Sequence, residues 1–271
     1  MEQALRKTEK AAPYVAQAHR LLDRLKEINT PSDLIGLDDI RDELVTAAGF
    51  SDKAAGYFSS GEIDDSLLTI LRAIESESGE KWREEILYRF LLTRGDSLGG
   101  TMRNITGAIA QVKFTQAVLE ALKTKAVKYQ VKTSPGNSNK VQRIVWPDRV
   151  CFFDKTPKFI GKNIDVILHD GCDTSNDALS EQSKYLACGE LKGGIDPAGA
   201  DEHWKTAGSA LQRIRQSFSK NPPKMFFAGA AIEESMAEEI FAQLKSGQLV
   251  HAANLTVPEQ VFDLATWLVA L

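Results

Sequence analysis

Two acids and a lysine on two predicted strands are the residues of this chain most able to do chemistry. Asp165 lies in KNIDVIL, and Glu190 and Lys192 lie in GELKGG. Residues two apart on a strand face the same side, so Glu190 and Lys192 should project together, and Asp165 joins them if the strands pair. The two carboxylates and the Leu191 carbonyl would then form an oxygen site for Mg²⁺. A metal beside a lysine is suited to hydrolysing a phosphodiester.

This pattern of an acid followed by Glu-x-Lys is weak evidence by itself, because acids and lysines are common. Its place on two predicted strands, with glycines on both sides of Glu-Leu-Lys, strengthens it. The alternative is a surface salt bridge between Glu190 and Lys192.

The stretch GGIDPAGADEHWKTA adds a histidine near the same place. Asp196 and Pro197 predict a helix start, with Asp as the N-cap and Pro at the first helical position, and the helix should run to about Phe218. His203 then falls in the first turns of that helix. Imidazole is the natural proton acceptor near neutral pH. Packing within the helix is the alternative for His203.

The elements that must position these residues differ between the two ends of the chain. The first ninety residues carry apolar positions at helical spacing. RGDSLGG, with its three glycines, predicts a turn, residues 102–127 predict one long helix, and TSPGNSNK predicts a loop. Strands are predicted at 161–170, 184–192, 224–232 and 249–255, and helices at 233–244 and 257–271. Helices followed by alternating strands and helices predict a helical front packed on an α/β core.

Composition and charge set broad limits. Hydrophobic residues make up 43% and charged residues 26% of the 271 residues, which is ordinary for a globular protein. The three cysteines form no CxxC pair, so neither a zinc site nor a disulfide framework is expected, and Cys188 is expected in the core. No apolar run is long enough for a membrane span and no secretory signal is evident, so an intracellular location is expected.

The net charge of −4 argues against a nucleic-acid partner, but the charge is unevenly distributed. Residues 94–162 contain thirteen Lys or Arg against four Asp or Glu. A basic middle segment can meet phosphates even in an acidic protein. A set of solvated surface charges is the alternative for this segment.

The chain resembles the AvaI/BsoBI type II restriction endonucleases, within the PD-(D/E)XK nuclease superfamily. The resemblance covers residues 12 to 207 and is carried, in order, by APYVAQA, DDIRDELVTAAGFSDKA, EEILYRFLLTRGDSLGGTMRN, KNIDVIL and GELKGGIDPAGADEHWKTA. Several unrelated motifs in one order are far more specific than the acid and Glu-x-Lys pattern. The region 128–161 looks shorter than its equivalent in the family, and the "PD" of the superfamily is Ile-Asp here.

The resemblance implies an α/β fold, with a central mixed β-sheet flanked by helices in a restriction-endonuclease-like core. It implies a mainly helical, DNA-embracing subdomain at 1–95 and a nuclease core at 96–271. The implied enzyme is a homodimer that encircles double-stranded DNA and cuts a CYCGRG-like palindrome with Mg²⁺, leaving 5′ overhangs. It would be cytoplasmic, without membrane contact, and would act beside a DNA methyltransferase of the same restriction-modification system.

The resemblance also implies individual roles. Asp165, Glu190 and Lys192 match the catalytic acids and lysine, and His203 matches a histidine proposed to act on the attacking water. Three further residues match DNA contacts: Asp196 and Lys162 to bases from the major groove and Lys53 to the minor groove. Lysine donates to guanine and aspartate accepts from cytosine, so these residue types suit base recognition.

Three other classes remain alternatives to a restriction enzyme. One is another PD-(D/E)XK nuclease with a different site or a DNA repair role. A catalytically inactive DNA-binding relative is less consistent with the intact acids and lysine. A structural α/β protein would have to carry the ordered motifs by chance.

Overall fold

The computed structural model describes residues 2–51, 54, 56–175, 177–196 and 199–271. The chain divides into two compact units, Met1–Met102 and Arg103–Leu271, and the boundary falls inside helix α6 (Trp82–Thr124). No helix in these residues is long and apolar enough to cross a membrane.

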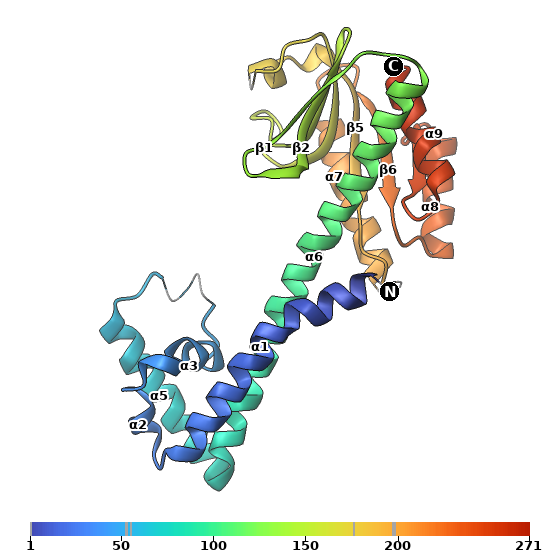
Figure 1. Cartoon of the computed structure of the whole chain (residues 1–271). Helices are drawn as coiled ribbons and strands as arrows, with labels where there is room; N and C mark the ends of the chain where they lie inside the picture. The colour runs from blue at the N-terminus through green and yellow to red at the C-terminus, as the bar shows by residue number, and fades with distance from the viewer. Residues whose placement is uncertain (1, 52–53, 55, 176, 197–198) are drawn as a thin grey trace. The chain divides into compact units, whose positions relative to one another are not determined.

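The first unit is built from helices around one core. Its helices are α1 (Glu2–Glu27), α2 (Pro31–Leu34), α3 (Arg41–Ala47), α5 (Ser60–Ser78) and the first part of α6, with the 3-10 turns η1 (Asp38–Ile40) and η2 (Gly79–Lys81) (Figure 1). Helix α5 begins at a capping box in which Ser59 accepts from the Glu62 backbone and the Glu62 carboxylate accepts from Ser59. Apolar residues at helical spacing fill the core, as the sequence predicts, including Leu21, Leu25 and Leu44.

The second unit contains a seven-stranded mixed sheet in the order β1 to β7. Its strands are β1 (Gln130–Ser134), β2 (Asn137–Trp146), β3 (Arg149–Lys155), β4 (Ile164–Asp170), β5 (Tyr185–Lys192), β6 (Lys224–Gly229) and β7 (His251–Asn254). The first five are antiparallel neighbours, whereas β5, β6 and β7 run parallel. The parallel strands are connected through helices α7 (Ala200–Gln216) and α8 (Glu234–Lys245), and α9 (Pro258–Val269) follows β7.

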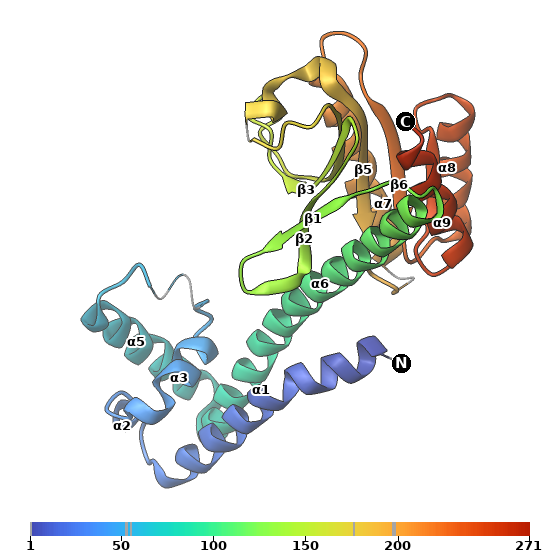
Figure 2. The same ribbon diagram turned by 45° about the horizontal axis from the view of Figure 1, so that its top comes forward.

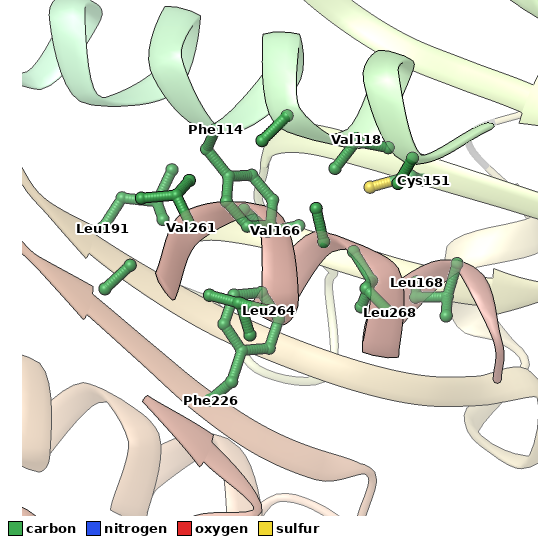
Figure 3. Packing of buried hydrophobic residues seen from close by; sticks show 14 of the residues in the cluster. Phe114, Val118, Cys151, Val166, Leu168, Leu191, Phe226, Val261, Leu264 and Leu268 are labelled. Atoms are coloured by element: carbon green, nitrogen blue, oxygen red, sulfur yellow. The ribbon is translucent and has the colours of Figure 1, made fainter. Parts of the chain in front are cut away.

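Helices cover both faces of this sheet. On one face, Phe114 and Val118 of α6 and Leu264 and Leu268 of α9 pack with Val166 and Leu191 of the sheet, and Figure 3 shows these side chains converging. On the other face, α7 and α8 pack through residues that include Trp204, Leu211 and Ile240. The predicted α/β class, with a mixed sheet between helices and a helical N-terminal part, is confirmed. Cys188 lies in the core as predicted, and the cysteines are free.

The structure corrects two local predictions. RGDSLGG is not a turn, because Gly95, Gly99 and Gly100 lie inside the continuous helix α6. Each glycine in a helix costs only about 1 kcal/mol relative to alanine, which the good helix formers on both sides offset. TSPGNSNK is not a loop but the tip of the β1–β2 hairpin, where Gly136 takes a φ of 73° in the turn. Figure 2 shows the two strands of this hairpin side by side.

Gly189 on β5 makes a close approach that no other residue type fits. A Cβ atom there would lie 2.1 Å from the ring of Phe226, which stacks on Phe114. We expect Gly189→Ala to lower the free energy of unfolding by about 1–3 kcal/mol, because the added methyl overpacks the core. Denaturant unfolding of Gly189→Ala, Phe226→Leu and the double variant would measure this. The smaller side chain should relieve the clash, so strictly additive losses would contradict the packing described here.

Candidate active site

Asp165, Glu190 and Lys192 lie on neighbouring strands and project from one face of the sheet. Val166 and Leu191 point into the core beneath α6 and α9. Alternation along each strand therefore sends Asp165, Glu190 and Lys192 to the opposite face, on which α7 packs. The pairing of β4 with β5 ends at Val166 and Gly189, so the three residues stand where the two strands separate.

Hydrogen bonds tie these side chains to one another and to the backbone. The Leu191 N–H donates to Asp165 Oδ2 at 2.8 Å, and Lys192 Nζ donates to Glu190 Oε2 at 3.2 Å. The side-chain amide of Asn163 lies 3.4 Å from Asp165 Oδ1. Glu190 is only 4% exposed, so its ion pair with Lys192 is not the solvated surface salt bridge of the alternative interpretation.

The two carboxyl groups resist ionising together. Burial and, to a smaller extent, the negative charge of Asp165 raise the pKa of Glu190 to about 7, against the opposing effect of Lys192. Burial also raises the pKa of Asp165, which the Leu191 N–H and the Lys192 charge partly offset. Two neighbouring acids that disfavour each other's charge are stabilised by a cation between them.

The donor set fits a hard divalent cation. The N–H and the carbonyl of one strand residue point to the same neighbour, so the Leu191 carbonyl faces Asp165 as its N–H does. Asp165, Glu190 and this carbonyl would supply hard oxygen ligands, which suit a small divalent cation such as Mg²⁺. Among the described residues no group of three or more His, Cys, Asp or Glu side chains gathers to hold a metal, so the site relies on two carboxylates and a backbone oxygen.

The end of β5 is fixed against α6 by a glycine. A Cβ atom on Gly193 would lie 2.0 Å from the backbone oxygen of Thr106, so only glycine permits this approach. Gly193 directly follows Lys192, and the contact therefore holds the strand end that carries the active-site side chains.

His203 lies in the first turn of α7, on the face from which Glu190 and Lys192 project. Its Nε2 atom packs against the loop after β5, because a Cβ on Gly194 would come within 2.8 Å of it. Among the described residues, no hydrogen bond links His203 to Asp165, Glu190 or Lys192. The structure thus places His203 beside the site, and its catalytic role stays a prediction.

The structure describes two of the three residues that are predicted to contact DNA. Lys162 is exposed in the segment before β4, and Asp196 is exposed in the loop between β5 and α7. The α-helical part of α7 begins at Ala200 with Gly199 as its N-cap, and the helix start predicted at Pro197 lies outside the described residues. The backbone carbonyl of Asp196 accepts from the Gly199 N–H, which forms a turn ahead of the helix. Lys53 lies outside the described residues.

Sequence reasoning missed three residues that act on the site. Asn163 contacts Asp165, Arg213 of α7 lowers the pKa of Glu190, and Asp154 of β3 raises the pKa of Asp165. Asn163 could have been found from its period-two spacing with Asp165. Arg213 and Asp154 reach the site through tertiary packing, for which the sequence carries no local signal.

Comparison with known proteins decides the family. The family model described as "Restriction endonuclease BsobI" matches residues 1–142 and 142–271. The chain belongs to the BsoBI restriction endonuclease family. It is 43% identical to "Type II restriction enzyme AvaI" of Nostoc sp. over 289 aligned residues, covering 99% of this chain and 91% of that protein. It is 41% identical to "Type II restriction enzyme BsoBI" of Geobacillus stearothermophilus, covering 98% and 90%.

The raised pKa of Glu190 predicts how pH affects this BsoBI-family protein without metal. Between its ordinary pKa and about 7, the folded state keeps the proton that the unfolded state has lost, so stability falls as pH rises through this window. We expect Glu190→Gln, which cannot ionise, to gain on the order of 2 kcal/mol relative to wild type between pH 4.5 and pH 8. Thermal unfolding in a chelator measures this, with Glu181→Gln, an exposed residue, as control. If the stability difference between Glu190→Gln and wild type were the same at pH 4.5 and pH 8, the raised pKa of Glu190 would be contradicted.

Proposed function

We propose that this type II restriction enzyme hydrolyses both strands of duplex DNA at a CYCGRG-like palindrome, with Mg²⁺, and leaves 5′ overhangs. The observation that carries the proposal is the meeting of Asp165, Glu190 and Lys192 where β4 and β5 separate, in a chain of the BsoBI family. The relatives are named AvaI and BsoBI, and 43% and 41% identity over nearly the whole chain support a shared reaction.

Each active-site residue has its own proposed role. Oxygen atoms of Asp165, Glu190 and the Leu191 backbone would hold the metal. When bound, Mg²⁺ supplies electrostatic stabilisation of the phosphate charge and acidifies water. Lys192 donates a hydrogen bond to a phosphate oxygen or to the attacking water, and its contact with Glu190 sets its direction. His203 accepts the proton of that water.

Recognition is assigned to other residues. Lys162 and Asp196 read base edges in the major groove, and Lys53 reaches the minor groove from the helical part, Met1–Met102, which embraces the DNA. A homodimer presents two such sets and two active sites to a palindrome. We place the enzyme in the bacterial cytoplasm, beside a methyltransferase that protects the same site.

Sequencing the ends of digested plasmid DNA tests the proposal. The expected result is a set of discrete fragments whose ends share one palindrome and one 5′ overhang. Nicks or breaks at DNA junctions or lesions, without a shared palindrome, would favour the second candidate, a repair nuclease of the same superfamily. The family match favours the first candidate.

Calcium should separate binding from cutting. It carries the charge of magnesium but takes looser and larger coordination, which positions the attacking water poorly. We expect a stable complex of two chains on one duplex in Ca²⁺, seen by light scattering, and cleavage only after Mg²⁺ is added. Rapid cutting in Ca²⁺ would contradict the proposed use of the metal. A complex with a single chain would contradict the proposed dimer.

A further inference from the structure

The active-site face of the sheet carries further charged residues on the strands beyond β4. Asp154 of β3 stands between the pairs Phe153–Val166 and Lys155–Ile164, and therefore opposite Asp165. Its carboxylate is close enough to Asp165 to raise the pKa of that residue. On the next strand, β2, Lys140 Nζ lies 3.8 Å from Asp154 Oδ2. Lys140, Asp154 and Asp165 thus form a row across three adjacent strands.

The backbone of Asp154 is held in an unusual conformation. Its φ is 51°, in the left-handed region that residues other than glycine seldom occupy, although Asp and Asn tolerate it best. Such a conformation costs free energy and persists only where the surroundings impose it. Here the conformation occurs at the residue that links Lys140 to the active site.

The row is long enough to span neighbouring phosphates of one DNA strand. Neighbouring strands are about 4.8 Å apart, so two strand spacings place Lys140 about 10 Å from Asp165. Phosphates advance by about 3.4 Å along the helix axis per nucleotide of one strand. Because the phosphates also wind around that axis, their direct separation is larger than this rise, so a phosphate one or two nucleotides from a scissile phosphate at Asp165 comes within reach of the Lys140 side chain.

Lys140 is also available to a ligand. Its side chain is 53% exposed, and the ion pair with Asp154 is long enough to leave other ammonium hydrogens free for an anion. Lys132 of β1 is a further exposed lysine of the same hairpin. The family match is divided at residue 142, within β2 of this hairpin. The alignment with AvaI is longer than this chain, so that relative carries segments without a counterpart here.

We propose that Lys140, on the β1–β2 hairpin, binds a DNA backbone phosphate that flanks the phosphodiester to be cut, and that Asp154 positions its ammonium group. The ligand is the phosphodiester backbone itself, so the contact is independent of base sequence. This inference rests on the proposed function, because it places the scissile phosphate at Asp165.

The test is the salt dependence of binding to a short fluorescent DNA duplex in a chelator, where no cutting occurs. Removing one phosphate contact lowers the slope of log affinity against log salt by about 1. We expect Lys140→Ala to show this, and its affinity deficit relative to wild type to shrink about 3-fold between about 50 and 200 mM salt. Lys140→Arg should restore the slope. Lys184→Ala is the matched control, since Lys184 is also ion-paired but lies before the opposite end of β5.

A second comparison, made in the Asp154→Asn variant, distinguishes phosphate binding by Lys140 from neutralisation of the Asp154 charge by Lys140. Asp154→Asn suits the left-handed backbone and removes the charge to be neutralised. In that background Lys140→Ala should still lower the slope by about 1. The inference would be overturned if Lys140→Ala left the slope unchanged in the Asp154→Asn variant. It would also be overturned if Lys184→Ala lowered the slope as much as Lys140→Ala does. Plasmid cutting by the wild-type preparation in Mg²⁺ tests the proposed function separately, so the two failures are distinguishable.

Discussion

Replacing Glu190 with glutamine is expected to lower the single-turnover rate of DNA cleavage by on the order of 10³-fold or more, with DNA binding retained. The side chain is 4% exposed, lies beside Asp165 and contacts Lys192, so the neutral amide removes a metal ligand while filling the same space. Affinity comes mainly from phosphate and base contacts elsewhere, which this change leaves in place. Gel-shift affinity and single-turnover cleavage, measured on one preparation, would show the separation.

The matched control lies at the other end of β5. Lys184 and Glu181 form an exposed ion pair before the first residues of that strand, and Glu181→Gln should leave the rate unchanged. Lys192→Ala should resemble Glu190→Gln, and the double variant should be little worse than either, because the residues act as a unit. If purified Glu190→Gln cut at the wild-type rate, the assignment of the site would be wrong.

The second large effect is expected at His203. Its removal should slow cleavage by on the order of 10²–10⁴-fold if it accepts the proton of the attacking water. Its position over Gly194, on the face of Glu190 and Lys192, supports this role. The measurement is the single-turnover rate of His203→Ala with and without added imidazole. Partial recovery in imidazole is expected for a missing base.

A packing role for His203 would give a different result. His203→Ala would then be less stable, would cut at the full rate at low temperature, and would not respond to imidazole. Asp196 gives a further contrast, since Asp196→Ala should cost about 1–3 kcal/mol of discrimination at one base pair and leave the rate on the best site intact.

The sequence predicts the active-site strands well for a physical reason. Strands β4, β5 and β6 are buried on both faces, so they appear as short runs of apolar residues, and period-two alternation correctly places Glu190 and Lys192 together. The helices α8 and α9 are amphipathic and were predicted within a few residues of their ends.

The remaining elements could not be predicted because their determinants are not local. Strands β1 and β2 mix exposed lysines with apolar residues, and they join the rest of the sheet only through β3, which pairs with β4. The glycines of RGDSLGG look like a turn until the helical segments on both sides fix their conformation. Likewise, Asp154 and Arg213 reach the site only through strand pairing and the packing of α7.

The most direct test of the central claim is digestion of one plasmid in Mg²⁺ by wild type, Asp165→Asn and Asp170→Asn. Both aspartates lie on β4, but Asp170 is at its far end, paired with Arg149, outside the site. We predict the same discrete fragments from wild type and Asp170→Asn, and intact plasmid from Asp165→Asn. Fragments released by Asp165→Asn at the wild-type rate would contradict the claim that DNA is cut at the site formed by Asp165, Glu190 and Lys192.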